Sequence, residues 1–161
     1  MATDNLLDVE RLNEKKEVSS MLDKVLFRRD KLKEIRGNTD LFATVNWSML
    51  PYMTDLWRKL LKDVLPSLPK RAKKPYFFVD LADPEKRENK EIKEALDLLK
   101  EFKDYFFVVL GLNKKEAYDV ANVIELFDSS SLQNMQISLE DLNQSLYEYL
   151  QIDSVVIHPV D

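Results

Sequence analysis

Two polar residues, Asn113 and Glu116, follow a run of aromatic and β-branched residues at the point where a helical pattern begins. The stretch Tyr105–Ala117 reads YFFVVLGLNKKEA, in which Tyr105–Val109 predicts a buried strand and Gly111 a tight turn. In open α/β sheets, ligands bind outside the carboxyl ends of the strands, so Asn113 and Glu116 lie where a metal-bound phosphate could be held. The same N-x-x-E spacing is that of a helix capping box. Both interpretations stay open, and they are compatible.

Other polar residues follow the remaining predicted strands, and a parallel sheet would place them along one edge: Asn46, Asp80, Asp83, Arg87 and His158. Asp80 and Asp83 could bind a cation or act as a general base, or they could form a turn in which Asp83-Pro84 starts a helix. Arg87 could hold a phosphate or pair with Glu91 at helical spacing. The single histidine has no Ser or Asp partner that the sequence can nominate, so no catalytic residue is predicted.

The elements that must position these residues follow from the apolar spacing. Helical stripes are predicted within residues 18–35, 53–64, 92–102, 117–127 and 139–150. Strands are predicted at 41–45, 76–79, 105–109 and 154–157, and a loop at 128–136. Continuous apolar strands separated by helices are typical of a parallel sheet covered on both faces. We therefore expect a three-layer α/β fold of about four strands, with a flexible segment at 1–16 and a single domain at 17–161.

Composition excludes several classes of function. The 161 residues are 45% hydrophobic, and 24 basic against 29 acidic residues leave a net charge of −5, which argues against nucleic-acid or membrane-surface binding. The absence of cysteine removes thiolate chemistry, and one histidine cannot build a His-rich metal site. Only two glycines are present, and no glycine-rich phosphate motif. No signal peptide is predicted, so the expected compartment is the cytoplasm.

Four segments together resemble the central part of the ribokinase-like sugar kinases, the phosphofructokinase-B family. They are TVNWSM at 44–49, FFVDLADPEKR at 77–87, FFVVLGLNKKEA at 106–117 and IDSVVIHPVD at 152–161. The resemblance covers nearly the whole chain from about Val18, and it implies part of the ribokinase fold. Members of this family phosphorylate a sugar hydroxyl with ATP and Mg²⁺.

The resemblance implies cofactor roles for the N-x-x-E pair. Asn113 and Glu116 would help to place the magnesium and its waters against the nucleotide phosphates, with Glu116 reaching the metal through water. Sugar-acid members carry a D-x-N-x-R loop in the place of Asp80–Arg87, and the longer spacing and Glu85 depart from it here. Asn46, Asp80, Asp83 and Arg87 therefore remain a possible edge of the site.

The departures from the family predict an incomplete enzyme. The G-A-G-D segment that carries the family's catalytic base, the early glycine-rich sugar-binding region and the β-sheet lid are not found in these 161 residues. The expectation is a sugar-kinase fragment that is inactive alone, with a sugar as the substrate of the parent enzyme. Such a fragment would form a homo-oligomer or contact a missing half. The alternatives are a non-catalytic α/β binding or interaction domain and a small-molecule-binding regulatory domain of flavodoxin-like order.

Overall fold

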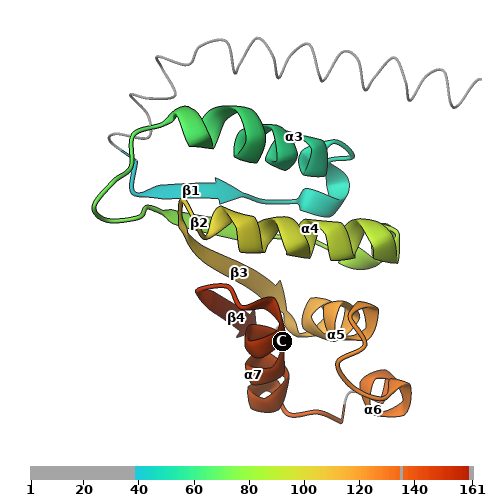
Figure 1. The fold of residues 1–161 in the computed structure, drawn as a ribbon. Helices are drawn as coiled ribbons and strands as arrows, with labels where there is room; N and C mark the ends of the chain where they lie inside the picture. The colour runs from blue at the N-terminus through green and yellow to red at the C-terminus, as the bar shows by residue number, and fades with distance from the viewer. Residues whose placement is uncertain (1–38, 135, 160–161) are drawn as a thin grey trace, which may run out of the picture.

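The structure is a computed structural model that describes residues 39–134 and 136–159 (Figure 1). The segment 1–16 and the predicted helix 18–35 lie outside the described residues. The strands are β1 (Leu41–Thr44), β2 (Tyr76–Asp80), β3 (Phe107–Asn113) and β4 (Ser154–His158). The helices are α3 (Met53–Lys59), α4 (Asn89–Phe102), α5 (Lys114–Val123), α6 (Ser129–Gln133) and α7 (Leu139–Leu150). Short 3-10 turns follow β1 at Trp47–Met49 and β2 at Pro84–Lys86.

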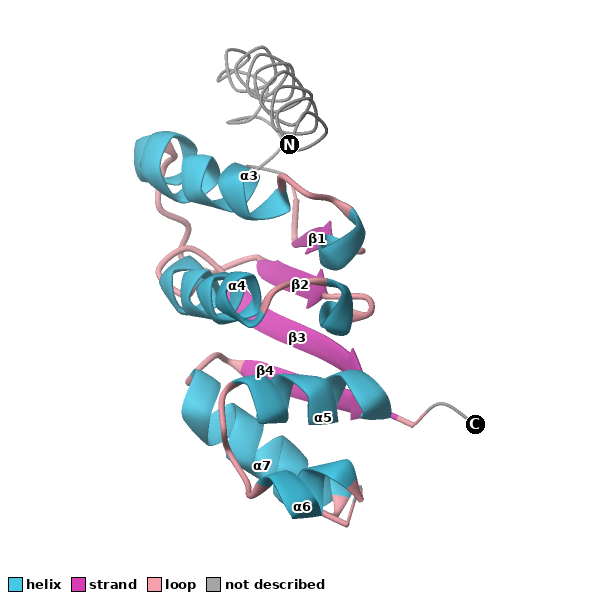
Figure 2. Ribbon diagram, turned by 90° about the vertical axis from the view of Figure 1, so that its right-hand side faces the viewer, coloured by secondary structure: helices cyan, strands magenta, loops and turns pink. Residues whose placement is uncertain are grey.

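The four strands form one parallel sheet in the order β1-β2-β3-β4, which confirms the predicted α/β class and its parallel sheet. Each crossover connects neighbouring strands, and right-handed crossovers that always step in one direction place their helices on one face. Figure 2 shows α3 and α4 side by side on the same side of the sheet. The buried hydrophobic side chains of that face, here called the inner face, are Phe77, Val79, Val108, Leu110, Leu112 and Val155. The opposite, outer face carries Leu41, Ala43, Tyr76, Phe78, Phe107, Val109 and Val156.

An aromatic cluster joins the inner face to its helices. The Phe77 ring of β2 lies 4.5 Å from the Phe102 ring of α4 and 6.1 Å from the Trp57 ring of α3, measured between centroids. Phe42 and Phe106 lie 5.4 and 5.5 Å from the same ring. Trp47 and Trp57 are fully buried. These contacts hold α3 and α4 on the sheet and therefore fix the positions of β1 and β2 beside them.

The predicted turn at Gly111 is wrong. β3 runs on through Asn113, and Gly111 lies inside it, paired with Asp80 on one side and Val156 on the other. A Cβ atom built on Gly111 would stand 2.8 Å from Cζ of Phe78, whose ring lies over the glycine on the outer face. The glycine is therefore required by close packing within a strand and not by a change of chain direction.

Further boundaries differ from the sequence prediction. The strand expected at 105–109 begins only at Phe107, and the helix expected over 117–127 ends at Val123. The helix expected over 53–64 is α-helical only to Lys59, after which Leu60–Val64 forms a π-helical turn. The loop expected at 128–136 contains α6, whose first turn is capped by Asp128 through a hydrogen bond from the Ser131 N–H. α7 is capped by Ser138, whose Oγ accepts the Asp141 N–H at 3.0 Å.

Candidate functional site

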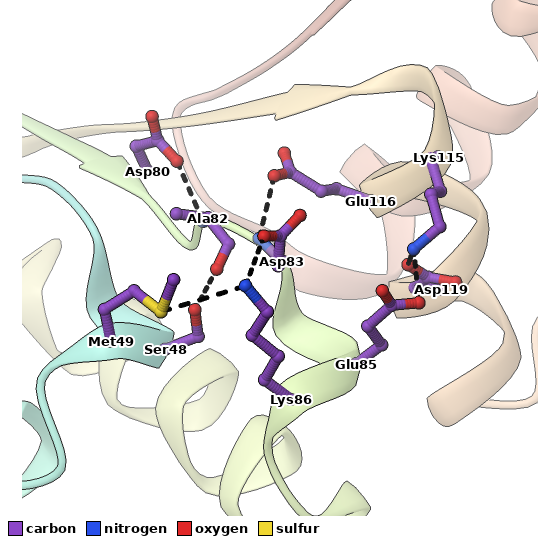
Figure 3. Close-up of polar contacts among 10 residues, drawn as sticks. All are labelled: Ser48, Met49, Asp80, Ala82, Asp83, Glu85, Lys86, Lys115, Glu116 and Asp119. Carbon is purple, nitrogen blue, oxygen red and sulfur yellow. Dashed lines mark hydrogen bonds and ion pairs between the residues drawn. The ribbon is translucent and has the colours of Figure 1, made fainter.

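The loop of residues 81–83, which follows β2, is hydrogen-bonded to the segments that follow both neighbouring strands (Figure 3). On the β1 side, the Ser48 N–H donates to the Leu81 carbonyl at 2.9 Å, and the Ser48 hydroxyl donates to the Ala82 carbonyl. On the β3 side, the Asp83 N–H donates to Oε1 of Glu116 at 3.0 Å. The carboxyl ends of β1, β2 and β3 are thereby held together at one edge of the sheet.

The loop reaches both neighbours because two of its residues adopt left-handed backbone conformations. Ala82 has φ 52° and Asp83 has φ 55°, a conformation that costs residues with a Cβ atom roughly 1–2 kcal/mol each. Asp80 offsets part of this cost, since its Oδ1 accepts the Ala82 N–H at 2.9 Å in the manner of an Asx turn. Pro84 then begins the 3-10 turn. The predicted turn-forming roles of Asp80 and Asp83 are confirmed.

Glu116 lies at the centre of this arrangement, with only 6% of its surface exposed. Its Oε2 accepts the Asn113 N–H at 2.8 Å, while Asn113 Oδ1 accepts the Glu116 N–H at 2.9 Å. The predicted capping box is confirmed. The bond from Asp83 is additional, so both carboxylate oxygens accept from backbone N–H groups, and the negative charge sits at the positive end of the α5 dipole.

The remaining predicted residues are distributed around this centre. His158 is exposed and pairs in register with Asn113, which places it beside the cap of α5. Asn46 is exposed and left-handed, with φ 60°, and its side chain makes no capping bond to the turn that follows.

Arg87 is held against Trp47, away from the capping box. Its guanidinium carbon lies 5.0 Å from the centroid of the Trp47 ring, and its Nη2 donates to the Pro51 carbonyl at 3.1 Å. The predicted pairing with Glu91 is confirmed, at 3.6 Å from Nε to Oε2. A phosphate contact of Arg87 stays a prediction.

Among the described residues, no group of three or more His, Asp or Glu side chains could hold a metal ion. Oδ2 of Asp83 binds Nζ of Lys86 at 2.8 Å, and this hydrogen bond, followed by the charge of Lys86, lowers the pKa of Asp83. A hydrated Mg²⁺ needs fewer protein ligands, because it keeps several waters and is bound through one or two carboxylates. Glu116 and Asn113 fit only that water-mediated kind of contact.

A second set of charges lies on the first turn of α5 (Figure 3). Nζ of Lys115 pairs closely with Glu85, and this hydrogen bond raises the pKa of Lys115. The same Nζ lies 3.5 Å from Oδ2 of Asp119. Lys115 therefore bonds mainly to Glu85, and the charge of Asp119 is compensated less. Burial raises the pKa of the Asp119 carboxyl.

Replacement of Asp119 by asparagine should stabilise the protein at pH 7. The folded state raises the pKa of this carboxyl above 3.8, so its ionisation destabilises the fold, and stability is lost as the pH rises through the folded pKa. We expect Asp119→Asn to gain less than about 0.5 kcal/mol, because the side chain is partly solvated. Urea unfolding at pH 7 and at pH 3 measures the change, which should vanish at the lower pH. A variant that is less stable at pH 7 would contradict the assignment.

Sequence reasoning missed Ser48, Ala82 and the pair Lys115–Glu85. Ser48 carries a weak signal, because it follows a buried tryptophan just beyond a strand. Ala82 carries none, since alanine does not favour positive φ. The lysine and the glutamate are 30 residues apart in sequence, and only the positions of β2 and β3 bring them together.

Comparison of the chain with models of known protein families, with curated proteins and with solved structures gives no match. Among the described residues, no helix combines the length and the apolar character that a membrane crossing requires.

Proposed function

We propose that this chain is part of an ATP-dependent sugar kinase of the ribokinase-like type, and that the carboxyl edge of its sheet meets the magnesium and phosphates of the nucleotide. One observation carries the proposal: the Asn113–Glu116 box lies at a strand end, at the start of a ten-residue helix, and is bonded to the loop after the neighbouring strand. The sequence resemblance links that same strand end to the nucleotide. The parallel pairing of β2 with β3 supports the proposal, because the loop at 81–83 and the start of α5 then lie at the same edge of the sheet.

In the proposed site, Mg²⁺ would supply charge neutralisation for the transferred phosphate. The residues of this chain orient the surroundings. Backbone N–H groups hold Glu116 in one position, which leaves the second lone pair of each oxygen for a water. The first turn of α5 presents N–H groups that the helix does not use, and such groups bind anions. The edge is thus suited to a hydrated cation together with a phosphate.

The chain by itself should not transfer a phosphoryl group. Its two glycines cannot form a backbone cradle for the terminal phosphate, and none of its residues is predicted to take the proton of the sugar hydroxyl. We expect no ATP-dependent sugar phosphorylation from these 161 residues alone, and clear activity would overturn the interpretation of the chain as a part of the enzyme.

Binding can be tested without activity by following backbone amide resonances while Mg·ADP is added to the full chain. The proposal predicts shifts confined to residues 81–83 and 113–116, and smaller shifts when EDTA removes the metal. Asn113→Asp keeps a good helix cap and adds a carboxylate, so it should tighten binding about two- to fivefold, the effect of roughly 0.5–1 kcal/mol from a partly exposed charge. Asn113→Ser keeps the cap without the charge and serves as the matched control. Shifts spread over other surfaces, or equal affinity of the two variants, would contradict the proposal.

A non-catalytic α/β binding or interaction domain is the second candidate. The observation that favours it is the full engagement of Glu116, whose two oxygens already accept from the chain's own backbone. In that case Asn113 and Glu116 only cap α5 and fasten the loop at 81–83. The titration separates the two functions, because the second predicts no metal-dependent shift at either residue.

A further inference from the structure

The outer face of the sheet presents apolar side chains in rows across neighbouring strands. Leu41, Tyr76 and Phe107 are paired in register, and their exposed fractions are 59%, 42% and 40%. The rings of Tyr76 and Phe107 meet edge to face, with centroids 5.2 Å apart. Such a row of large exposed apolar groups on β1, β2 and β3 is unusual for a surface that faces water.

The rows that follow continue the apolar surface toward the middle of the sheet. Ala43, Phe78 and Val109 form the second row, and Val156 of β4 is 47% exposed beside Gly111. Apart from Ser154 at the start of β4, the polar residues of the same face lie at the carboxyl ends of the strands, with Asp80, Asn113 and His158. Parallel sheets are covered on both faces, but the described helices cover only the inner one. The outer face therefore has the character of a buried surface without its cover.

We propose that residues 18–35 of this chain form that cover, as an amphipathic helix whose apolar stripe packs on the outer face. The stripe consists of Val18, Met21, Leu22, Val25, Leu26, Leu32 and Ile35. An 18-residue helix is about 27 Å long, and the seven-residue β3 is about 23 Å long. The helix would thus run along the full length of the strands. This inference is independent of the proposed sugar-kinase function.

The connection to β1 has the right length and an appropriate sequence. Five residues, 36–40, separate the stripe from Leu41, and they can span up to about 17 Å, whereas packed layers lie about 10 Å apart. Gly37 and Asn38 are residues that typically end a helix. On the inner side, the place next to β1 and β2 is taken by α3, whose Trp57 is fully buried. The outer face is the apolar surface left within reach.

A second copy of the chain fits the outer face less well. Pairing of two outer faces would leave the apolar stripe of residues 18–35 in water in both copies. Packing of the stripe on its own sheet buries both surfaces in one contact. The short tether also gives the segment an effective concentration of about millimolar or more, above that of a second chain in solution. The intrachain contact is therefore the one that we test.

The absence of cysteine allows a direct crosslinking test in the full chain. Val25→Cys lies on the stripe, and Val109→Cys lies on the outer face of β3, one of the two central strands. A bismaleimide of about 10 Å, the spacing of packed layers, should join the two cysteines within one chain. The matched control pairs Val109→Cys with Asp23→Cys, which lies on the opposite side of the predicted helix. Tyr76→Cys replaces Val109→Cys if the latter lowers the cooperativity of unfolding.

The expected result is an intramolecular crosslink that forms at least about tenfold faster with Val25→Cys than with Asp23→Cys. In the proposed contact, the first cysteine faces the sheet and the second faces away from it. Digestion and mass spectrometry identify the joined peptides, and a denaturing gel separates monomers from dimers. Equal rates for the two cysteines would overturn the proposal. Dimers that form through Val109→Cys alone would also overturn it, and they would assign the face to a second copy.

Discussion

Replacement of Phe77 by alanine should lower the free energy of unfolding by about 3–5 kcal/mol, the range measured for buried aromatic side chains. Phe77 is fully buried, and its ring contacts aromatic rings from β1, α3, α4 and the segment before β3. Its loss would leave a cavity between the sheet and two helices that rigid neighbouring rings cannot fill. Because domains of this size are stabilised by only about 5–15 kcal/mol, a large part of the stability depends on this one ring.

The measurement is urea unfolding followed by far-UV circular dichroism, because Trp57 contacts Phe77 and its fluorescence would change for local reasons. Tyr147→Ala is the matched control, since it also removes an aromatic ring but from an exposed position on α7. We expect the control to cost less than about 1 kcal/mol. Equal losses for the two variants would show that the cluster around Phe77 is not the organising part of the core.

The strands and most helices could be predicted because their signals are local. β2 and β4 read as short apolar runs, and each predicted boundary lies within one residue of the observed one. Gly111 could not be placed correctly, because glycine is read as a turn unless its neighbour is known. The neighbour that requires it, Phe78, belongs to another strand and is 33 residues away. A propensity argument cannot supply a contact of that kind.

The candidate site divides in the same way. The bonds between Asn113 and Glu116 span three residues of one helix start, so the N-x-x-E pattern predicted them. The bond from Asp83 to Glu116 depends on two consecutive left-handed residues and on the register of β2 with β3. Residue types do not predict either condition, since the alanine at position 82 does not favour positive φ. The hydrogen bonds between Asn113 and Glu116 could therefore be predicted from the sequence, and the long-range bond from Asp83 could not.

Replacement of Glu116 by alanine should lower the free energy of unfolding by at least about 3 kcal/mol, because hydrogen bonds to charged groups contribute roughly 1.5–3 kcal/mol and two of them are lost. The N–H groups of Asp83 and Asn113 would both lose their acceptor. The loop at 81–83 would also lose its bond to the β3 side, while its bonds to Ser48 remain. Chemical denaturation measures the loss, and Glu85→Ala, which removes only an exposed ion pair, should cost less than about 1 kcal/mol.

Glu116→Gln separates the two bonds within this arrangement. Its amide oxygen can accept from only one of the two backbone donors, and its NH₂ group would face the other, so the stability should fall between the wild type and alanine. Amide hydrogen exchange shows which bond survives. If the capping box dominates, the Asn113 amide keeps its protection from exchange and the Asp83 amide loses it. The reason is that only the bond from Asp83 depends on the strained loop. If both amides kept their wild-type protection in Glu116→Ala, the role of Glu116 as the link between β2 and β3 would be contradicted. Loss at Asp83 alone in the glutamine variant would show that this link is the weaker of the two bonds.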